Sequence, residues 1–91
     1  MRGRVHVLAR TPDHPRHQRC LAMLGPDDTL VLTAAALERL TQSAPLEGIQ
    51  AGSILALTES PEDLRLPPAC AVITHADFVD QLLTVHQPVF W

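Results

Sequence analysis

Short apolar runs alternate along this chain with segments whose apolar residues recur every three or four positions. The runs lie at residues 4–8, 29–32, 53–57 and 70–73, and each is rich in Val, Ile and Leu. Because they are apolar throughout, they are expected to be strands covered on both faces, as in a parallel sheet. The pattern predicts a single α/β domain over residues 1–91, with a parallel sheet of about four strands and helices on both faces.

The first two segments between these runs have the spacing of helices. His17, Cys20, Leu21 and Leu24 form one stripe at helical spacing. This helix could begin with Thr11 as the cap, or later with Pro15 at its first position. A second helix is expected over residues 34–42, capped by Thr33, with Ala36, Leu37 and Leu40 facing inward.

The last third of the chain repeats the alternation. Residues 60–63 have the signature of a helix start that continues for about one turn. Thr74 and Asp77 have the spacing of a capping box, and the positions after them place an apolar stripe on one helix face. The members of this stripe are Phe78, Val79, Leu82, Leu83 and His86.

The chain ends in Pro88-Val89-Phe90-Trp91, which places two of its three aromatic residues in the last two positions. Terminal residues fray unless something holds them. Either the domain itself or a partner protein is expected to hold this segment. Phe90 and Trp91 are therefore candidate interface residues.

Charge and composition narrow the function classes. The formal charge is -3 and the isoelectric point is about 5.9, and all seven basic residues are arginine. General nucleic-acid or membrane-surface binding needs a dense basic patch, so neither is expected. The two cysteines lack zinc-ligand spacing, and no apolar stretch approaches the ~20 residues of a membrane span. A reduced, cytoplasmic protein without cofactor or metal is the expectation.

Reactive groups are sparse in this sequence, and Cys20 is the candidate nucleophile. It lies between Arg16, His17 and Arg19, whose positive charge would favour a thiolate. The competing interpretation is a small buried side chain, since Cys20 shares the stripe of Leu21 and is then inert. His14, His17 and Cys20 also resemble a metal-ligand series, but their spacing suits one ion poorly.

Short motifs follow one another along nearly the whole chain. These are Ala9-Arg10-Thr11-Pro12 after the first run, Cys20-Leu21, Gly25-x-Asp27 before the second run, Glu62-Asp63-Leu64 after the third, and Phe78-Val79 with a later Trp91. In this order they resemble the TusB/DsrH family of sulfur-relay proteins. The chain departs from the family pattern at residues 33–36, where the family commonly has Asp-Gly-Val, and at His86, which stands one position late.

The resemblance implies a fold of the DsrE/DsrF-like type. It also implies assembly with TusC/DsrF-like and TusD/DsrE-like subunits into a heterohexamer, which passes persulfide sulfur to a TusE/DsrC-like acceptor. This sulfur transfer would serve either 2-thiouridine formation at the tRNA wobble position or dissimilatory sulfur oxidation. In the family the essential cysteine belongs to the TusD/DsrE subunit, so this chain would be a non-catalytic partner.

Two other functions stay open at the level of the sequence. One is a persulfide carrier that uses Cys20 itself. The other is a stand-alone homo-oligomeric binding module.

Overall fold

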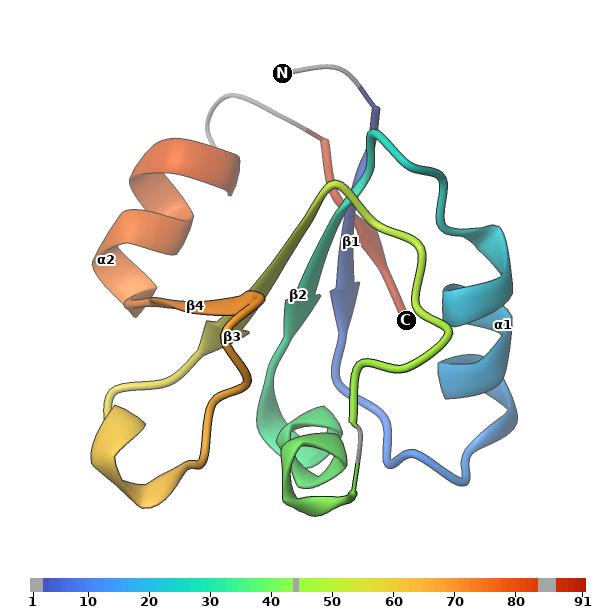
Figure 1. Ribbon diagram of the computed structural model, residues 1–91. Coiled ribbons are helices and arrows are strands. Elements are labelled where there is room, and N and C mark those ends of the chain that lie inside the picture. Colours follow the sequence, from blue (N-terminus) through green and yellow to red (C-terminus); the bar gives the residue numbers. More distant parts are fainter. Residues whose placement is uncertain (1–2, 44, 84–86) are drawn as a thin grey trace.

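A five-stranded parallel sheet forms the centre of the computed structural model, which describes residues 3–43, 45–83 and 87–91 (Figure 1). The strand order is β4-β3-β2-β1-β5, and every neighbouring pair is parallel. The strands are β1 Val5–Leu8, β2 Thr29–Leu32, β3 Ser53–Leu57, β4 Cys70–Ile73 and β5 Val89–Phe90. The α/β class and the parallel sheet are therefore as predicted.

The predicted number of about four strands was too low, because the C-terminal segment adds β5. It pairs with β1 in the register His6 to Val89 and Val7 to Phe90. A strand of two residues shows no periodicity. Its sequence offered aromatic residues but no pattern from which a strand could be predicted.

Helices of three kinds connect the strands. The α-helices are α1 Pro15–Met23 and α2 His75–Phe78, and α2 continues as the π-helical turn η3 Val79–Leu83. The segment predicted as a helix over 34–42 is the 3₁₀ helix η1 Ala34–Thr41, and η2 Pro61–Asp63 is a single 3₁₀ turn. His86 lies outside the described residues.

The helix starts follow from their capping residues. In α1 the cap is His14, whose Nδ1 accepts a hydrogen bond from the Arg16 backbone N–H at 3.1 Å, and Pro15 stands at the first position. The later of the two predicted starts is therefore correct. In α2 the hydroxyl of Thr74 accepts from the Asp77 N–H at 3.2 Å, as the capping spacing predicts. Thr33 and Ser60 make no such side-chain bond.

Two apolar clusters cover the two faces of the sheet, and Figure 1 shows α1 and α2 on opposite sides of it. On one face Cys20 of α1 and Leu40 of η1 pack against Leu8, Leu30 and Leu32. On the other face Phe78 and Leu82 pack against the sheet. Their strand partners in this second cluster are Val5, Val7, Val31, Leu57 and Ile73.

This arrangement follows from the strand order. The chain steps from β1 to β4 in one direction and then returns past β1 to form β5. Since parallel crossovers keep one hand, a reversal of direction places the connecting helix on the opposite face. That helix is α2.

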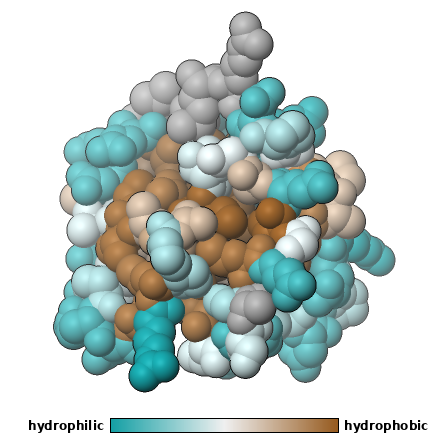
Figure 2. Space-filling model, viewed as in Figure 1, coloured by the Kyte–Doolittle hydropathy of each residue, from teal (hydrophilic) through white to brown (hydrophobic). Residues whose placement is uncertain are grey.

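The cover over β4 is incomplete. Ala71 and Val72 are exposed, so the expectation that this strand is covered on both faces was wrong. For Val72, which lies on the same face as Cys70, the physical reason is the connection from β3 to β4, where η2 provides one turn instead of a full helix. Figure 2 shows a broad apolar area on this side of the molecule.

Replacing Ala34 by glycine is expected to raise the free energy of unfolding by about 1 kcal/mol. Ala34 has φ of 51°, in the left-handed region where a Cβ is strained. Urea denaturation followed by circular dichroism measures the change. The matched control is Ala35→Gly in the same 3₁₀ helix, which should lower stability by about 0.5–1 kcal/mol. Equal effects of the two substitutions would mean that Ala34 carries no strain.

Candidate functional site

Cys20, the candidate nucleophile, lies in the interior. Its side chain is fully buried between α1 and the sheet, within the cluster that contains Leu8 and Leu30. Burial raises the pKa of Cys20 to about 12, so the thiol is protonated at neutral pH. The positive charges of Arg16 and Arg19 do not offset this, since both side chains are exposed on the outer face of α1. Cys20 therefore has the properties of a structural cysteine.

Cys70 is in a similar position at the start of β4. It is buried, and burial raises the pKa of this thiol as well. Both cysteines are free, with no disulfide. Among the described residues no group of three or more His, Cys, Asp and Glu side chains could hold a metal ion, so His14, His17 and Cys20 do not converge.

Alkaline conditions are expected to destabilise the protein through Cys20. Its folded pKa of about 12 lies above the value of roughly 8.5 for an unfolded thiol. The unfolded state therefore loses its proton first, and stability present below about pH 8.5 is lost as pH rises towards 12. Replacing Cys20 by alanine should flatten this part of the stability profile, measured by urea denaturation between about pH 7 and pH 10.5.

If the stability of the Cys20→Ala variant falls equally steeply as pH rises, groups other than Cys20 cause the loss of stability at alkaline pH. Cys70→Ala is the matched control, because burial raises the pKa of that thiol too and its removal should leave the contribution of Cys20 in place.

A polar cluster lies at the carboxyl end of the sheet beside α1. His17 is completely buried, and its Nδ1–H donates to the carbonyl of Arg10 at 2.9 Å. Its Nε2 then faces the guanidinium of Arg39 at 3.4 Å, and Arg39 also donates from Nε to the Pro45 carbonyl at 2.7 Å. Burial chiefly, with the charge of Arg39, lowers the pKa of His17. His17 is thus held neutral as a link between α1 and η1.

The two C-terminal aromatic residues, Phe90 and Trp91, differ in their burial. Trp91 packs against the α1 face of the sheet, and its backbone N–H donates to the Val7 carbonyl at 2.9 Å. Its indole N–H donates to Nδ1 of His6 at 3.1 Å, and the two rings stack with centroids 6.1 Å apart. Phe90, in contrast, is 61% exposed on the edge strand. The domain itself therefore holds the tail, while Phe90 remains available to a partner.

Asp28 completes this network from the loop before β2. Because the indole is a donor only, Nδ1 of His6 accepts, and the proton of the neutral ring lies on Nε2. That Nε2–H donates to Asp28 Oδ2 at 3.3 Å. The same carboxylate accepts backbone N–H bonds from Arg4 at 2.8 Å and Gly25 at 2.9 Å, and these bonds hold the pKa of Asp28 below its usual range.

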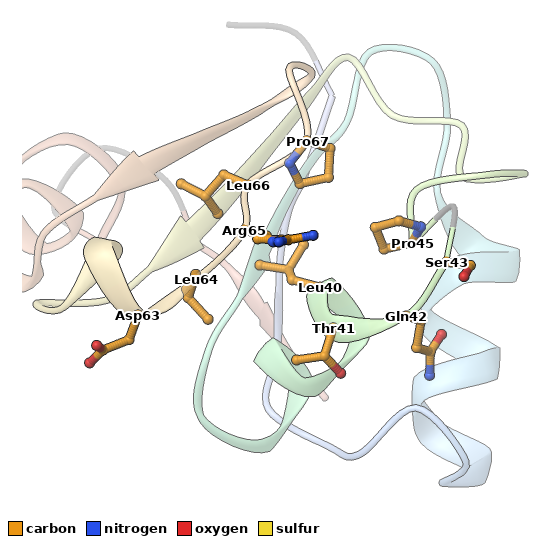
Figure 3. Close-up of a pocket in the computed structure, with 10 residues that line it drawn as sticks. All are labelled: Leu40, Thr41, Gln42, Ser43, Pro45, Asp63, Leu64, Arg65, Leu66 and Pro67. Atoms are coloured by element: carbon orange, nitrogen blue, oxygen red, sulfur yellow. The ribbon is translucent and has the colours of Figure 1, made fainter.

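A groove of about 610 Å³ opens on the same face as α1 and η1 (Figure 3). One wall is formed by residues 40–43 and Pro45, and the other by residues 63–67. Figure 3 shows the Arg65 side chain reaching from its wall towards the opposite one, while Asp63 points away. Sequence reasoning missed this groove because its two walls are far apart in the chain and neither contains a recognisable motif.

Comparisons with known proteins add no assignment. A scan of the chain against protein-family models finds no match, and a search of curated proteins finds no relative at a significant level. In the part of the chain that the structure describes, no helix is long and apolar enough to cross a membrane.

Proposed function

We propose that this protein is a non-catalytic subunit of a cytoplasmic sulfur-relay complex that transfers persulfide sulfur for 2-thiouridine formation at the tRNA wobble position. Its partners in the proposed heterohexamer are a TusC/DsrF-like and a TusD/DsrE-like subunit, with a TusE/DsrC-like protein as the later acceptor. The ordered motifs of the sequence motivate the family. The structural observation that supports a subunit role is Phe90.

Phe90 has the properties of an interface anchor. It is a large aromatic side chain that is 61% exposed, and it lies on β5, one of the two edges of the sheet. Its backbone is fixed, because β5 pairs with β1 and Trp91 is bonded on both its backbone and its indole nitrogen. An aromatic side chain on a fixed backbone loses less entropy on binding than one on a mobile segment, so Phe90 suits a protein interface.

The two thiols support the non-catalytic part of the proposal. A persulfide carrier needs a thiolate that a donor protein can reach. Cys20 is 0% exposed with a raised pKa, and Cys70 is 7% exposed with a raised pKa. The alternative in which Cys20 carries sulfur would require α1 to separate from the sheet. The burial of both thiols therefore favours a relay cysteine on another subunit.

The experiment is coexpression with TusC/DsrF-like and TusD/DsrE-like chains from the same genome, followed by native mass spectrometry. The expected result is a stoichiometric three-chain complex that weakens by about tenfold or more on Phe90→Ala. The control is Met23→Ala, which removes another exposed apolar side chain, 60% exposed, from α1. Absence of a complex with the wild-type chain would refute the proposal.

Sulfur loading tests the assignment of roles. After incubation with a cysteine desulfurase and cysteine, the mass of an added sulfur atom should appear on the TusD/DsrE-like chain. An adduct on the present chain that disappears in Cys20→Ser would instead establish the carrier function.

A further inference from the structure

His6 is a buried histidine whose ring is hydrogen-bonded on both nitrogens. It is 2% exposed, its Nδ1 accepts the indole N–H of Trp91 at 3.1 Å, and its Nε2–H donates to Asp28 at 3.3 Å. Because the indole can only donate, this arrangement requires the neutral imidazole ring. A proton added to Nδ1 would face the indole N–H with no acceptor between them. The side-chain bond that joins Trp91 to β1 therefore exists in one charge state of His6 only.

Within residues 87–91, few other hydrogen bonds hold β5. This strand has two residues and a single neighbouring strand, with Val89 opposite His6 and Phe90 opposite Val7. Trp91 adds one backbone bond, from its N–H to the Val7 carbonyl at 2.9 Å. A short strand at the edge of a sheet separates at a lower free energy than the interior strands. The loss of one side-chain bond can therefore shift the balance between a closed form, in which β5 is paired with β1, and an open form, in which the two are separated.

The charged and titratable groups around His6 come from several elements. Asp28, in the loop before β2, makes the only ion pair of His6 in the described part of the chain, and its backbone bonds hold its pKa below the usual range. From α1, the apolar cluster on this side of the sheet includes Cys20, whose thiol stays protonated because burial raises its pKa. Arg4, two positions before His6, is exposed. The carboxylate of Asp28 thus stabilises an imidazolium, whereas the indole donor of Trp91 opposes it.

From this geometry we propose that protonation of His6 releases β5 from β1, so that the bond between His6 and Trp91 is a latch that is closed at neutral pH and opens in mild acid. In the closed form a proton on Nδ1 has a donor beside it and no access to water. In the open form the indole is removed, so Nδ1–H can donate to water while Nε2–H still donates to Asp28. The open form therefore binds the proton more tightly, and by linkage the proton favours the open form. Release uncovers the edge of β1 and the apolar surface on which Trp91 packs.

Nuclear magnetic resonance of the full-length chain between about pH 7.5 and pH 5 tests the proposal, because an ordinary histidine titrates in this range and Asp28 remains ionised. The imidazole signals report the charge of His6. Hydrogen exchange of the Trp91 backbone N–H, expressed as a protection factor, reports the ratio of closed to open forms. This factor should fall by about tenfold as His6 takes up its proton, with the same midpoint. The protection factors of β2 should not change.

Three variants assign the change to the latch. His6→Asn supplies an acceptor near the position of Nδ1 that does not titrate, so protection at position 91 should no longer depend on pH. Trp91→Phe removes the indole donor, so His6 should bind its proton about tenfold more tightly than in the wild type. The matched control is His75→Asn, which removes an exposed histidine from α2 and should behave as the wild type does.

Three results would overturn the proposal. A constant protection factor while His6 becomes charged would mean that the imidazolium stays stacked on the indole as a cation–π pair and that β5 stays closed. An equal loss of protection in His6→Asn would assign the release to another group. A His6 that stays neutral down to about pH 5 would mean that the latch does not respond to mild acid. The proposal concerns this chain alone and does not rest on the sulfur-relay function.

Discussion

Substituting Trp91 by alanine is expected to lower the free energy of unfolding by about 3 kcal/mol. The indole ring is partly buried against the α1 face of the sheet and stacks on His6. Its removal loses this packing, and it also leaves the buried Nδ1 of His6 without a donor. An unsatisfied buried acceptor adds a penalty of about 1–3 kcal/mol to the loss of apolar contact.

Two variants separate these contributions. Trp91→Phe keeps an aromatic ring but removes the indole donor, so it should cost about 1–2 kcal/mol. Phe90→Ala is the matched control, since the adjacent aromatic side chain is 61% exposed, and it should cost less than about 0.5 kcal/mol.

Urea denaturation followed by far-UV circular dichroism suits all three variants, because Trp91 is the single tryptophan and fluorescence is lost with it. Similar losses in Trp91→Ala and Phe90→Ala would show that the tail does not depend on the His6 bond.

The sequence was sufficient for the parts of the fold that periodic patterns specify. The four apolar runs are strands at or within one residue of the predicted positions, and the helix starts at Pro15 and after Thr74 are set by local chemistry. These features depend on neighbours within one turn or one strand. Local sequence therefore predicted them correctly.

The missed features depend on residues far apart in the chain. The strand β5 exists because Val89 meets His6, and η1 is 3₁₀ instead of α-helical after a strained start at Ala34. Arg39 is not among the residues predicted to face inward, yet it bonds to Pro45 and faces the buried His17. No spacing rule connects such residues, since the contacts arise only once the sheet has formed.

The candidate site was predicted in part. Cys20 was given two interpretations, and its complete burial agrees with the structural one. Phe90 and Trp91 were both predicted to be candidate interface residues. Because successive side chains of an extended segment point to opposite sides, the two residues lie in different surroundings. Asp28 was not predicted to belong to a site, because nothing in the sequence links it to His6 over 22 positions.

Replacing Asp28 by alanine is expected to cost about 2–3 kcal/mol of stability at neutral pH. The carboxylate accepts bonds from the backbone N–H groups of Arg4 and Gly25 and from Nε2 of His6, so a single side chain satisfies three donors. His6 is 2% exposed, and its Nε2–H would lose its partner inside the protein. Asp28→Asn keeps one carbonyl acceptor and should cost about half as much.

The same residue gives the protein a defined sensitivity to acid. The bonds from Arg4 and Gly25 hold the folded pKa of Asp28 below the unfolded value of about 3.9. On acidification the unfolded state therefore binds the proton first. The stabilisation is complete well above about pH 4 and is lost as pH falls through the folded pKa.

The stability difference between wild type and Asp28→Asn should accordingly be largest near neutral pH and shrink below about pH 4, measured by urea denaturation between about pH 7 and pH 2.5. Asp27→Asn is the control, because the adjacent carboxylate is exposed, and its difference from wild type should stay small at every pH. A constant difference for Asp28→Asn would mean that the carboxylate acts by its shape rather than its charge. A difference that shrinks would show that the ionised form of Asp28, which accepts from Arg4 and Gly25, stabilises the loop before β2.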